Sequence, residues 1–344
     1  MKSPYRRDAE SLISQAYRSM KSAGQEAESD RILARYQLTP NKQATGTIVA
    51  AHGKKMQTAA DPSTTPPRWG GAPHPDYDFA GIMGALYGDG ITALKGDFPR
   101  AWVQQLHEDI GKAYEEALQR PGGAVGRGPN RHYVEIHPED IRGFLDLVTH
   151  PWVLAVCETV LGPEYKIVEI GFDVPNPGAV QQPWHRDFPA PPDTIYGRRL
   201  NSLAFNLTTV DVEEDMGPFE IAPGTQWDLP DGFEHGMFPP KALYPRYEAR
   251  ASRRLPKMGD LSVRSALTIH RGTANNSQKA RPTLVLGVDA PGAINAERHD
   301  LQLTKRYVET LPETVRRHLT FRLVDELEPI VQAHSIEGLM MGEA

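Results

Sequence analysis

The segment LSVRSALTIHRGTANNSQKARPTLVLGVDA, residues 261–290, decides the fold class of this chain. It holds two runs rich in leucine and β-branched residues, 261–270 and 283–290, separated by polar residues and turn formers. Similar runs lie upstream at YKIVEIGFDV (165–174) and LAFNLTTVDV (203–212). Strands that follow one another without alternating helices predict an antiparallel β-sandwich or jelly roll.

Helical patterns flank these strands. Apolar residues recur at helical spacing in 98–119, and a second apolar helix is expected over 151–161, ending at Gly162. The segment 311–333 also reads as helix. We therefore expect a mainly β domain with flanking and C-terminal helices over residues 89–344.

Residues 1–88 differ in character from the rest and form a separate N-terminal extension in this interpretation. The spacing of apolar residues predicts helix within 5–37, whereas 39–76 is crowded with turn formers and is expected to be irregular. Such an extension could act as a linker, a lid or a contact in a homo-oligomer.

Composition excludes several classes of protein. The chain has 344 residues, a net charge of -6 and one cysteine, Cys157, so neither an intrachain disulfide nor a cysteine-based zinc site is possible. No apolar run approaches the roughly 18 residues of a membrane span, and no signal peptide is visible. The mild acidity disfavours nucleic-acid binding. We expect a cytoplasmic protein in which any metal is held by histidine and carboxylate side chains.

Four His-x-acid pairs are candidates for metal binding. Residues two apart share a face on a strand but diverge on a helix, so such a pair can chelate one ion only in extended chain. The pairs are His74/Asp76, His107/Asp109, His137/Glu139 and His185/Asp187. The first lies in a Pro-rich loop, the second in the helix 98–119 and the third at a helix start. Only His185/Asp187 lies in the β-rich half, and its spacing alone leaves ligand and structural roles equally open.

His270 supplies a third possible ligand, since it ends the strand-like run 261–270. Two histidines and one carboxylate form the facial triad of non-haem Fe(II) oxygenases. Zinc hydrolases use a similar ligand set, so the triad alone does not fix the reaction.

Arg281 bears on that choice. If 273–280 is the loop of a hairpin, residue 281 lies opposite 272 and diagonal to His270, on the same face. An arginine there could bind a carboxylate through two hydrogen bonds, as for 2-oxoglutarate chelated to iron at its other end. Geometry alone leaves a surface arginine equally open.

At this point the sequence resembles a known family. The segments QPWHRDF (182–188), MGPFEIAPGTQW (216–227) and GDLSVRSALTIHRGTANNSQKARPTL (259–284) are similar to the phytanoyl-CoA dioxygenase family of Fe(II)/2-oxoglutarate oxygenases. The ligand order, the PGT turn and the arginine eleven residues past the second histidine all fit. The resemblance covers about 88–300.

The resemblance implies a double-stranded β-helix (a cupin-like jelly roll) that carries iron on His185, Asp187 and His270. It also implies that Arg281 binds the distal carboxylate of 2-oxoglutarate and that Gln182 contacts the same co-substrate, although a turn glutamine is an equal alternative. The implied reaction uses O2 to hydroxylate, or otherwise oxidise, a C–H bond of a small molecule, releasing succinate and CO2.

The substrate pocket is harder to predict. Candidate walls are Phe205, Phe219 and Trp227. The arginine pairs 198–199 and 253–254 are short and are expected at the surface. Rival interpretations are a Zn- or Mn-dependent cupin-like hydrolase or isomerase with the same ligands, and a non-catalytic jelly-roll binding protein.

Overall fold

The chain divides into two compact units, Met1–Asp89 and Gly90–Ala344. The structure is a computed structural model that describes residues 38–41, 47–50, 77–293 and 299–331.

The described part of the first unit holds a hairpin and a helix. Strands β1 (Leu38–Asn41) and β2 (Thr47–Ala50) pair antiparallel, within a segment expected to be irregular. Helix α3 (Phe79–Gly88) begins after Asp78, whose carboxylate accepts a hydrogen bond from the Gly81 N–H. The helix expected within 5–37 lies outside the described residues.

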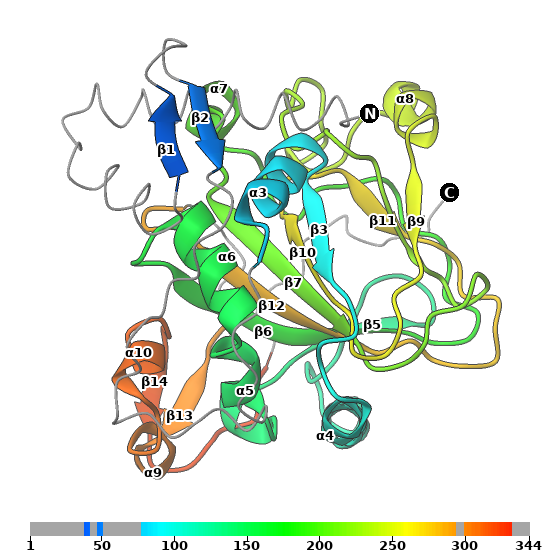
Figure 1. Cartoon of the computed structure of the whole chain (residues 1–344). Helices are drawn as coiled ribbons and strands as arrows, with labels where there is room; N and C mark the ends of the chain where they lie inside the picture. The colour runs from blue at the N-terminus through cyan, green and yellow to red at the C-terminus, as the bar shows by residue number, and fades with distance from the viewer. Residues whose placement is uncertain (1–37, 42–46, 51–76, 294–298, 332–344) are drawn as a thin grey trace. The chain divides into compact units, whose positions relative to one another are not determined.

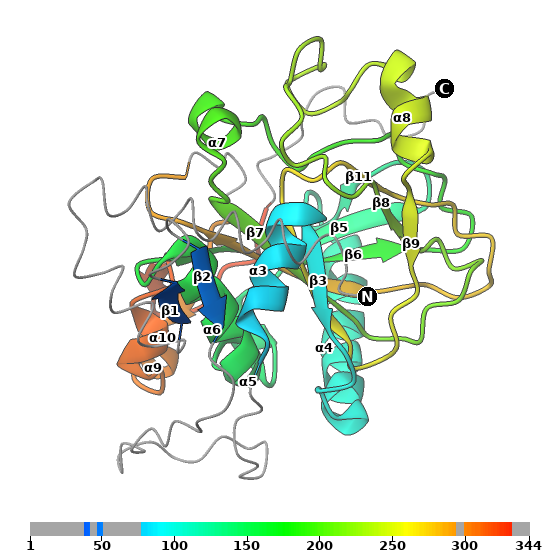
Figure 2. The same cartoon turned by 45° about the horizontal axis from the view of Figure 1, so that its top comes forward.

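The second unit is built on two antiparallel sheets (Figures 1 and 2). The larger sheet has the strand order β3 (Ile91–Leu94), β10 (Leu261–Ser265), β7 (Ser202–Thr208), β12 (Thr283–Asp289), β6 (Lys166–Pro175), β5 (Arg131–Glu135) and β4 (Val125–Gly126). The smaller sheet has the order β11 (His270–Gly272), β8 (Phe219–Ile221) and β9 (Ser252–Arg254). The mainly β architecture expected from the strand-like runs is confirmed.

The two faces of the larger sheet differ in chemistry. On β7, Phe205 and Leu207 alternate with Asn206 and Thr208. Phe205 packs edge-on against Trp152 of helix α6 (Pro151–Leu161), which lies across β7, β12 and β6 in Figure 1. One face of this sheet is therefore an apolar helix-covered core, and the other carries polar side chains into the space between the sheets.

Two of the expected helices are confirmed: α4 (Arg100–Leu118) and α6, which ends at Gly162. The other helices between residues 90 and 293 are short. They are η1 (Pro138–Asp140), α5 (Phe144–Val148), α7 (Pro192–Gly197), η2 (Lys241–Leu243) and α8 (Tyr244–Glu248). Within the described residues, no helix combines the length and apolar character needed to cross a membrane.

The expectation of one helix over 311–333 is wrong for its described part. Helices α9 (Lys305–Val308) and α10 (Glu313–Arg316) are single turns, and β13 (Gln302–Thr304) pairs in parallel with β14 (Arg322–Val324). Helical spacing in the sequence was overridden by tertiary pairing, because β14 follows closely on α10 and is held by β13.

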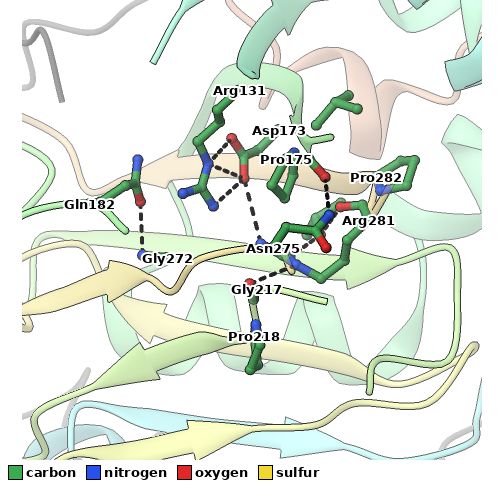
Figure 3. Close-up of polar contacts among 12 residues, drawn as sticks. Arg131, Asp173, Pro175, Gln182, Gly217, Pro218, Gly272, Asn275, Arg281 and Pro282 are labelled. Atoms are coloured by element: carbon green, nitrogen blue, oxygen red, sulfur yellow. Dashed lines mark hydrogen bonds and ion pairs between the residues drawn. The ribbon is translucent and has the colours of Figure 1, made fainter. Parts of the chain in front are cut away.

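The run 261–270 is also not one strand. Strand β10 ends at Ser265, a turn follows, and the chain resumes as β11 in the other sheet. The chain crosses back to the larger sheet before β12. His270 and Arg281 therefore do not belong to one hairpin, and the hairpin expected from the sequence is wrong. The crossing segment is held by the buried Asn275, whose amide donates to the carbonyls of Pro175 and Lys279 (Figure 3).

Candidate metal centre and ligand cavity

Three side chains with metal-binding atoms meet between the two sheets. His185 and His270 form an isolated antiparallel bridge in which each N–H donates to the other's carbonyl, at 3.0 and 2.8 Å. Asp187 N donates to the carbonyl of Ala266 at 3.0 Å, which fixes the backbone of the same segment two residues further along. The backbone thus aligns His185, Asp187 and His270 on one side.

The ligand atoms of these three residues lie within 4.8 Å of one another. His270 Nε2 is 3.2 Å from Asp187 Oδ1, and the two imidazole rings have centroids 4.4 Å apart. Small side-chain rotations bring all three atoms onto one ion. No other such group of three occurs in the part of the chain that the structure describes.

Both histidines have the tautomer that metal binding requires. The Nδ1 atom of His185 lies 2.9 Å from the carbonyl of Pro183, and that of His270 lies 2.8 Å from the carbonyl of Thr268. A carbonyl can only accept, so each Nδ1 carries a proton and each Nε2 keeps a lone pair, that of His270 lying 3.2 Å from Asp187 Oδ1. The donor set therefore fits a divalent transition metal.

Burial reinforces this state. Removal from water, together with the neighbouring His270, lowers the pKa of His185 to about 3. Burial likewise lowers the pKa of His270. Both imidazoles are neutral near pH 7, as ligands must be.

The PGT turn positions the second histidine. Thr225 donates its hydroxyl hydrogen to the carbonyl of Ala222 at 2.6 Å and accepts the N–H of Ile269 at 2.9 Å. Ala222 N in turn donates to the carbonyl of Ile269. The fully buried Thr225 side chain thus fixes the residue just before His270.

Sequence reasoning missed Arg264, which reaches the carboxylate ligand from β10. Its Nη1 and Nη2 atoms contact the two oxygens of Asp187, the second at 3.2 Å. Burial acts to raise the pKa of Asp187, but the Arg264 guanidinium beside it acts to lower it, and that pKa lies well below its usual range. Asp187 is therefore a carboxylate whose orientation Arg264 sets. No local motif announces this contact, because the two residues are 77 positions apart.

Replacing Arg264 with methionine is expected to lower iron affinity by about 10- to 100-fold, the usual effect of losing a residue that orients a metal ligand. The carboxylate would lose the guanidinium paired with it and rotate away from the histidines. Anaerobic Fe(II) titration of the purified variant measures this, and an unchanged dissociation constant would contradict the assigned role.

The other His-x-acid pairs have structural partners. His107 Nδ1 lies 2.8 Å from Thr209 Oγ1, and Asp109 binds Arg142. His137 Nδ1 accepts the N–H of Gln302, and Glu139 accepts from Thr304. His74 and Asp76 lie outside the described residues.

Arg281 lines the cavity that contains the three ligands, although the hairpin argument that led to it was wrong. It enters from the start of β12, where its N–H donates to the carbonyl of Pro175. Its Nε donates to the carbonyl of Gly217 at 3.0 Å and its Nη1 to Thr283 Oγ1 at 2.8 Å (Figure 3). Burial lowers the pKa of Arg281 to about 10, which leaves it cationic at pH 7.

A second arginine, Arg131 of β5, lies at the same end of the cavity and was not expected. It binds both oxygens of Asp173, with Nε 3.0 Å from Oδ1 and Nη2 3.1 Å from Oδ2 (Figure 3). Arg281 Nη2 is 3.8 Å from the same carboxylate. Two guanidinium groups thus share one carboxylate, and the buried Nη1 of Arg131 has no hydrogen-bond partner among the described residues. One positive charge is left over, so this end of the cavity suits an anion.

Glycine at position 272 makes room for Arg131. A Cβ added there would lie 2.2 Å from both Nη atoms of Arg131. Gly272→Ala is expected to push the guanidinium off Asp173 and to cost about 1–3 kcal/mol of unfolding free energy, as overpacking does. Gly126→Ala is the matched control, because a Cβ at Gly126 meets nothing within 4 Å. Denaturant unfolding of both variants checks this, and equal stabilities would contradict it.

Gln182 is joined to Gly272 by two hydrogen bonds. Its backbone N–H donates to the Gly272 carbonyl at 2.9 Å, and its Oε1 accepts the Gly272 N–H at 2.8 Å (Figure 3). The carboxamide oxygen is therefore engaged, and only the amide NH2 group could contact a ligand in the cavity that Gln182 lines.

The cavity has a volume of about 1210 Å³, its open mouth included. Phe219 lines it, with its ring 5.1 Å from that of His270. Phe205 does not, because it lies on the helix-covered face of β7 against Trp152. Trp227 is also outside the lining and packs beneath the guanidinium of Arg198. Only one of the three expected walls is therefore in place.

The residues around the ligand pair are core, since Trp184 and Phe188 are almost completely buried. Arg186 is buried as well, at 1% exposed. Its guanidinium lies 4.7 Å from the Phe233 ring and donates to the carbonyl of Asp228.

Comparison with known proteins gives extended matches to a family model and to a curated protein. The family model described as phytanoyl-CoA dioxygenase (PhyH) matches residues 86–283, more than half of the chain. The dioxygenase cdmD of Talaromyces verruculosus is 24% identical over 279 residues, which are 71% of this chain and 85% of that protein.

Solved structures give more distant likenesses. EctD from S. alaskensis, crystallised with 2-oxoglutarate and 5-hydroxyectoine, is 17% identical with a TM-score of 0.48, over 60% of this chain and 74% of that one. AviO1 from Streptomyces viridochromogenes Tue57 is 18% identical with a TM-score of 0.49, over 64% of this chain and 98% of that one.

The family match spans the three ligand candidates His185, Asp187 and His270, and Arg281 at the anion-binding end of the cavity. The chain belongs to the phytanoyl-CoA dioxygenase family.

Proposed function

We propose that this dioxygenase depends on Fe(II) and 2-oxoglutarate and oxidises a C–H bond of a small-molecule metabolite, with release of succinate and CO2. In this proposal His185, Asp187 and His270 hold the iron, and Arg281 binds the distal carboxylate of 2-oxoglutarate. The bound iron supplies O2 activation, and the protein supplies placement.

One observation carries the proposal. Two neutral histidines and one carboxylate share a cavity with two buried arginines, Arg131 and Arg281. The two positive charges of these arginines face the single negative charge of Asp173. A dicarboxylate that binds the metal at one end needs a cation at the other, and Arg281 with Arg131 provides it. His185, Asp187 and His270 would hold the metal through three protein ligands, which would leave it able to take the co-substrate and O2.

The side chains around the ligands would position the substrate and keep out water. The Phe219 ring covers His270, and the Phe238 ring lies 6.0 Å from that of His185. Met237 joins them in the lining. An apolar collar of this kind protects a reactive centre from side reactions.

Two rival functions use the same cavity. A Zn- or Mn-dependent hydrolase or isomerase would need the three ligands but would have no use for the buried arginine pair. A non-catalytic binding protein would have no need for two histidines and a carboxylate whose ligand atoms lie within 4.8 Å of one another. Family membership and the arginine pair both favour the oxygenase.

The test is succinate formation from 2-oxoglutarate by the purified protein in air with Fe(II), with and without members of a metabolite panel. We expect succinate to require Fe(II) and to rise when a substrate is present. Activity on any panel compound with Zn(II) or Mn(II) and no 2-oxoglutarate would favour the hydrolase or isomerase instead.

Three further expectations remain predictions. A cytoplasmic location agrees with a single cysteine, Cys157, which is buried as a free thiol. Homo-oligomer formation through residues 1–88 can be checked by light scattering of the full chain and of a chain starting at residue 89. The absence of nucleic-acid binding can be checked by gel shift.

A further inference from the structure

The cavity holds more positive than negative side chains. Six arginines line it, and so do three carboxylates, Glu169, Asp173 and Asp187. The arginines are Arg127, Arg131, Arg186, Arg254, Arg264 and Arg281. The guanidinium of Arg186 lies against the Phe233 ring and donates through Nη2 to the carbonyl of Asp228, while its Nε and Nη1 have no hydrogen-bond partner among the described residues.

Three of the six arginines pair with a carboxylate of the cavity. Arg264 holds Asp187, and Arg131 with Arg281 shares Asp173. Arg186 is stacked on the Phe233 ring, which leaves Arg127 and Arg254. Because the two charges of Fe(II) cancel those of the 2-oxoglutarate dianion, loading the proposed site does not remove the positive excess.

Arg254 lines the same cavity as the three metal-ligand candidates and can therefore contact a molecule bound beside them. It pairs with Phe219 across β8 and β9, and Phe219 pairs with Gly272 across β8 and β11. Paired residues share a face, and Gly272 shares its face with His270, two residues away. Arg254 therefore lies on the metal-bearing face of the small sheet, beyond the Phe219 ring.

The side chain of Arg254 is short of partners. Its Nε is buried and has no hydrogen-bond partner in the described part of the chain. The adjacent Arg253 is the opposite case: it points to the other face, is half exposed and pairs with Glu220. The expectation that both arginines of this pair are at the surface is wrong for Arg254.

Arg127 repeats the pattern at the edge of the large sheet. Its guanidinium carbon lies 5.1 Å from the centre of the Tyr133 ring, and its buried Nε has no hydrogen-bond partner among the described residues. Tyr133 itself donates to Glu169 at 2.6 Å.

We propose that the substrate is an anion, a small molecule whose carboxylate or phosphate group binds Arg254, with Arg127 as a second contact. This inference rests on the proposed function, since it assigns 2-oxoglutarate to the Arg281 end. A buried Nε donor without a partner is costly, and an incoming oxyanion satisfies it with a charge-assisted hydrogen bond. The apolar lining of Val212, Phe238 and Pro256 suits the carbon skeleton of such a molecule.

The test uses hexanoate, hexyl phosphate and hexanamide as probes, titrated calorimetrically into protein loaded anaerobically with Fe(II) and saturating 2-oxoglutarate. We expect at least one charged probe to bind about 10-fold or more tightly than hexanamide, the effect of one charge-assisted hydrogen bond. Comparing the two charged probes tells a carboxylate site from a phosphate site. Equal affinity for all three, or no measurable binding of either charged probe, overturns the proposal.

Arg254→Gln is expected to abolish the preference for the charged probe and to leave hexanamide binding unchanged. Arg253→Gln is the matched control and should retain the preference. Arg127→Gln should weaken it by a smaller factor. Thermal melts show that each variant is folded, and a preference that survives in folded Arg254→Gln contradicts the assignment.

Failure of this inference can be told from failure of the proposed function. Fe(II) and 2-oxoglutarate are titrated first on the same preparations. If they bind and the charged probes show no preference, only the anion site is wrong. If they do not bind but hexanoate still depends on Arg254, the proposed function is wrong and the anion site remains.

Discussion

His270→Ala is expected to lower the affinity for Fe(II) by more than about 100-fold, since even the loss of a residue that only orients a ligand costs 10- to 100-fold. Turnover with 2-oxoglutarate should fall below detection. The physical reason is that His270 contributes one of three donor atoms and, among the described residues, the only other histidine lining the cavity is His185, which is already a ligand. Anaerobic Fe(II) titration and succinate formation measure the two effects.

His107→Ala is the matched control for that variant. His107 also belongs to a His-x-Asp pair, but it lies on α4 and its Nδ1 contacts Thr209. Its loss should leave both iron affinity and turnover unchanged. Iron affinity that falls equally in the two variants, or in neither, would refute the assigned ligand set.

Arg281→Leu is expected to weaken 2-oxoglutarate binding by about 100-fold or more while leaving Fe(II) affinity within a few-fold of the natural chain. The loss of hydrogen bonds to a charged group costs about 1.5–3 kcal/mol each, and a guanidinium can provide two to one carboxylate. Calorimetric titration of 2-oxoglutarate into the Fe(II)-loaded variant, without O2, gives the number.

Arg281 also binds Gly217 and Thr283, so a folding defect must be told from a binding defect. Arg281→Lys keeps the charge but not the forked geometry, and should recover part of the affinity. Arg100→Leu, at an exposed arginine paired with Asp211, is the control. Unchanged 2-oxoglutarate affinity in folded Arg281→Leu would mean that another group anchors the co-substrate.

The sequence predicted the parts of the site that depend on local pattern. His185 and Asp187 were separated from the other His-x-acid pairs because their surroundings were extended rather than helical. His270 followed from the end of a strand-like run. Arg281 was reached through a hairpin that does not exist, yet the residue lines the cavity because the chain returns to the larger sheet just before it.

The sequence could not predict contacts that depend on the register of distant strands. Arg264 meets Asp187 from another strand, and Arg131 meets Asp173 across β5 and β6. Nothing in the segments around these arginines differs from those of surface arginines. The prediction of Phe205 as a pocket wall was wrong for a related reason. Alternate residues of a strand point to opposite faces, and here Asn206 lines the cavity while Phe205 packs against Trp152.

Short segments near the C-terminus were misjudged because tertiary pairing competes with weak helical propensity. Thr304 begins the single turn α9 as its N-cap, accepting the Tyr307 N–H, but Arg322–Val324 is drawn into a parallel pair with β13. Periodicity predicts long regular elements well, and such short ones poorly.

The most direct test of the account is a titration of 2-oxoglutarate, under anaerobic conditions, into the metal-free protein and into the protein carrying one equivalent of Fe(II). The account predicts one binding site for 2-oxoglutarate per chain, with affinity raised at least about 10-fold by iron, because the co-substrate then binds metal and arginine together. Binding that is absent, or that is equally strong with and without iron, would contradict the shared site.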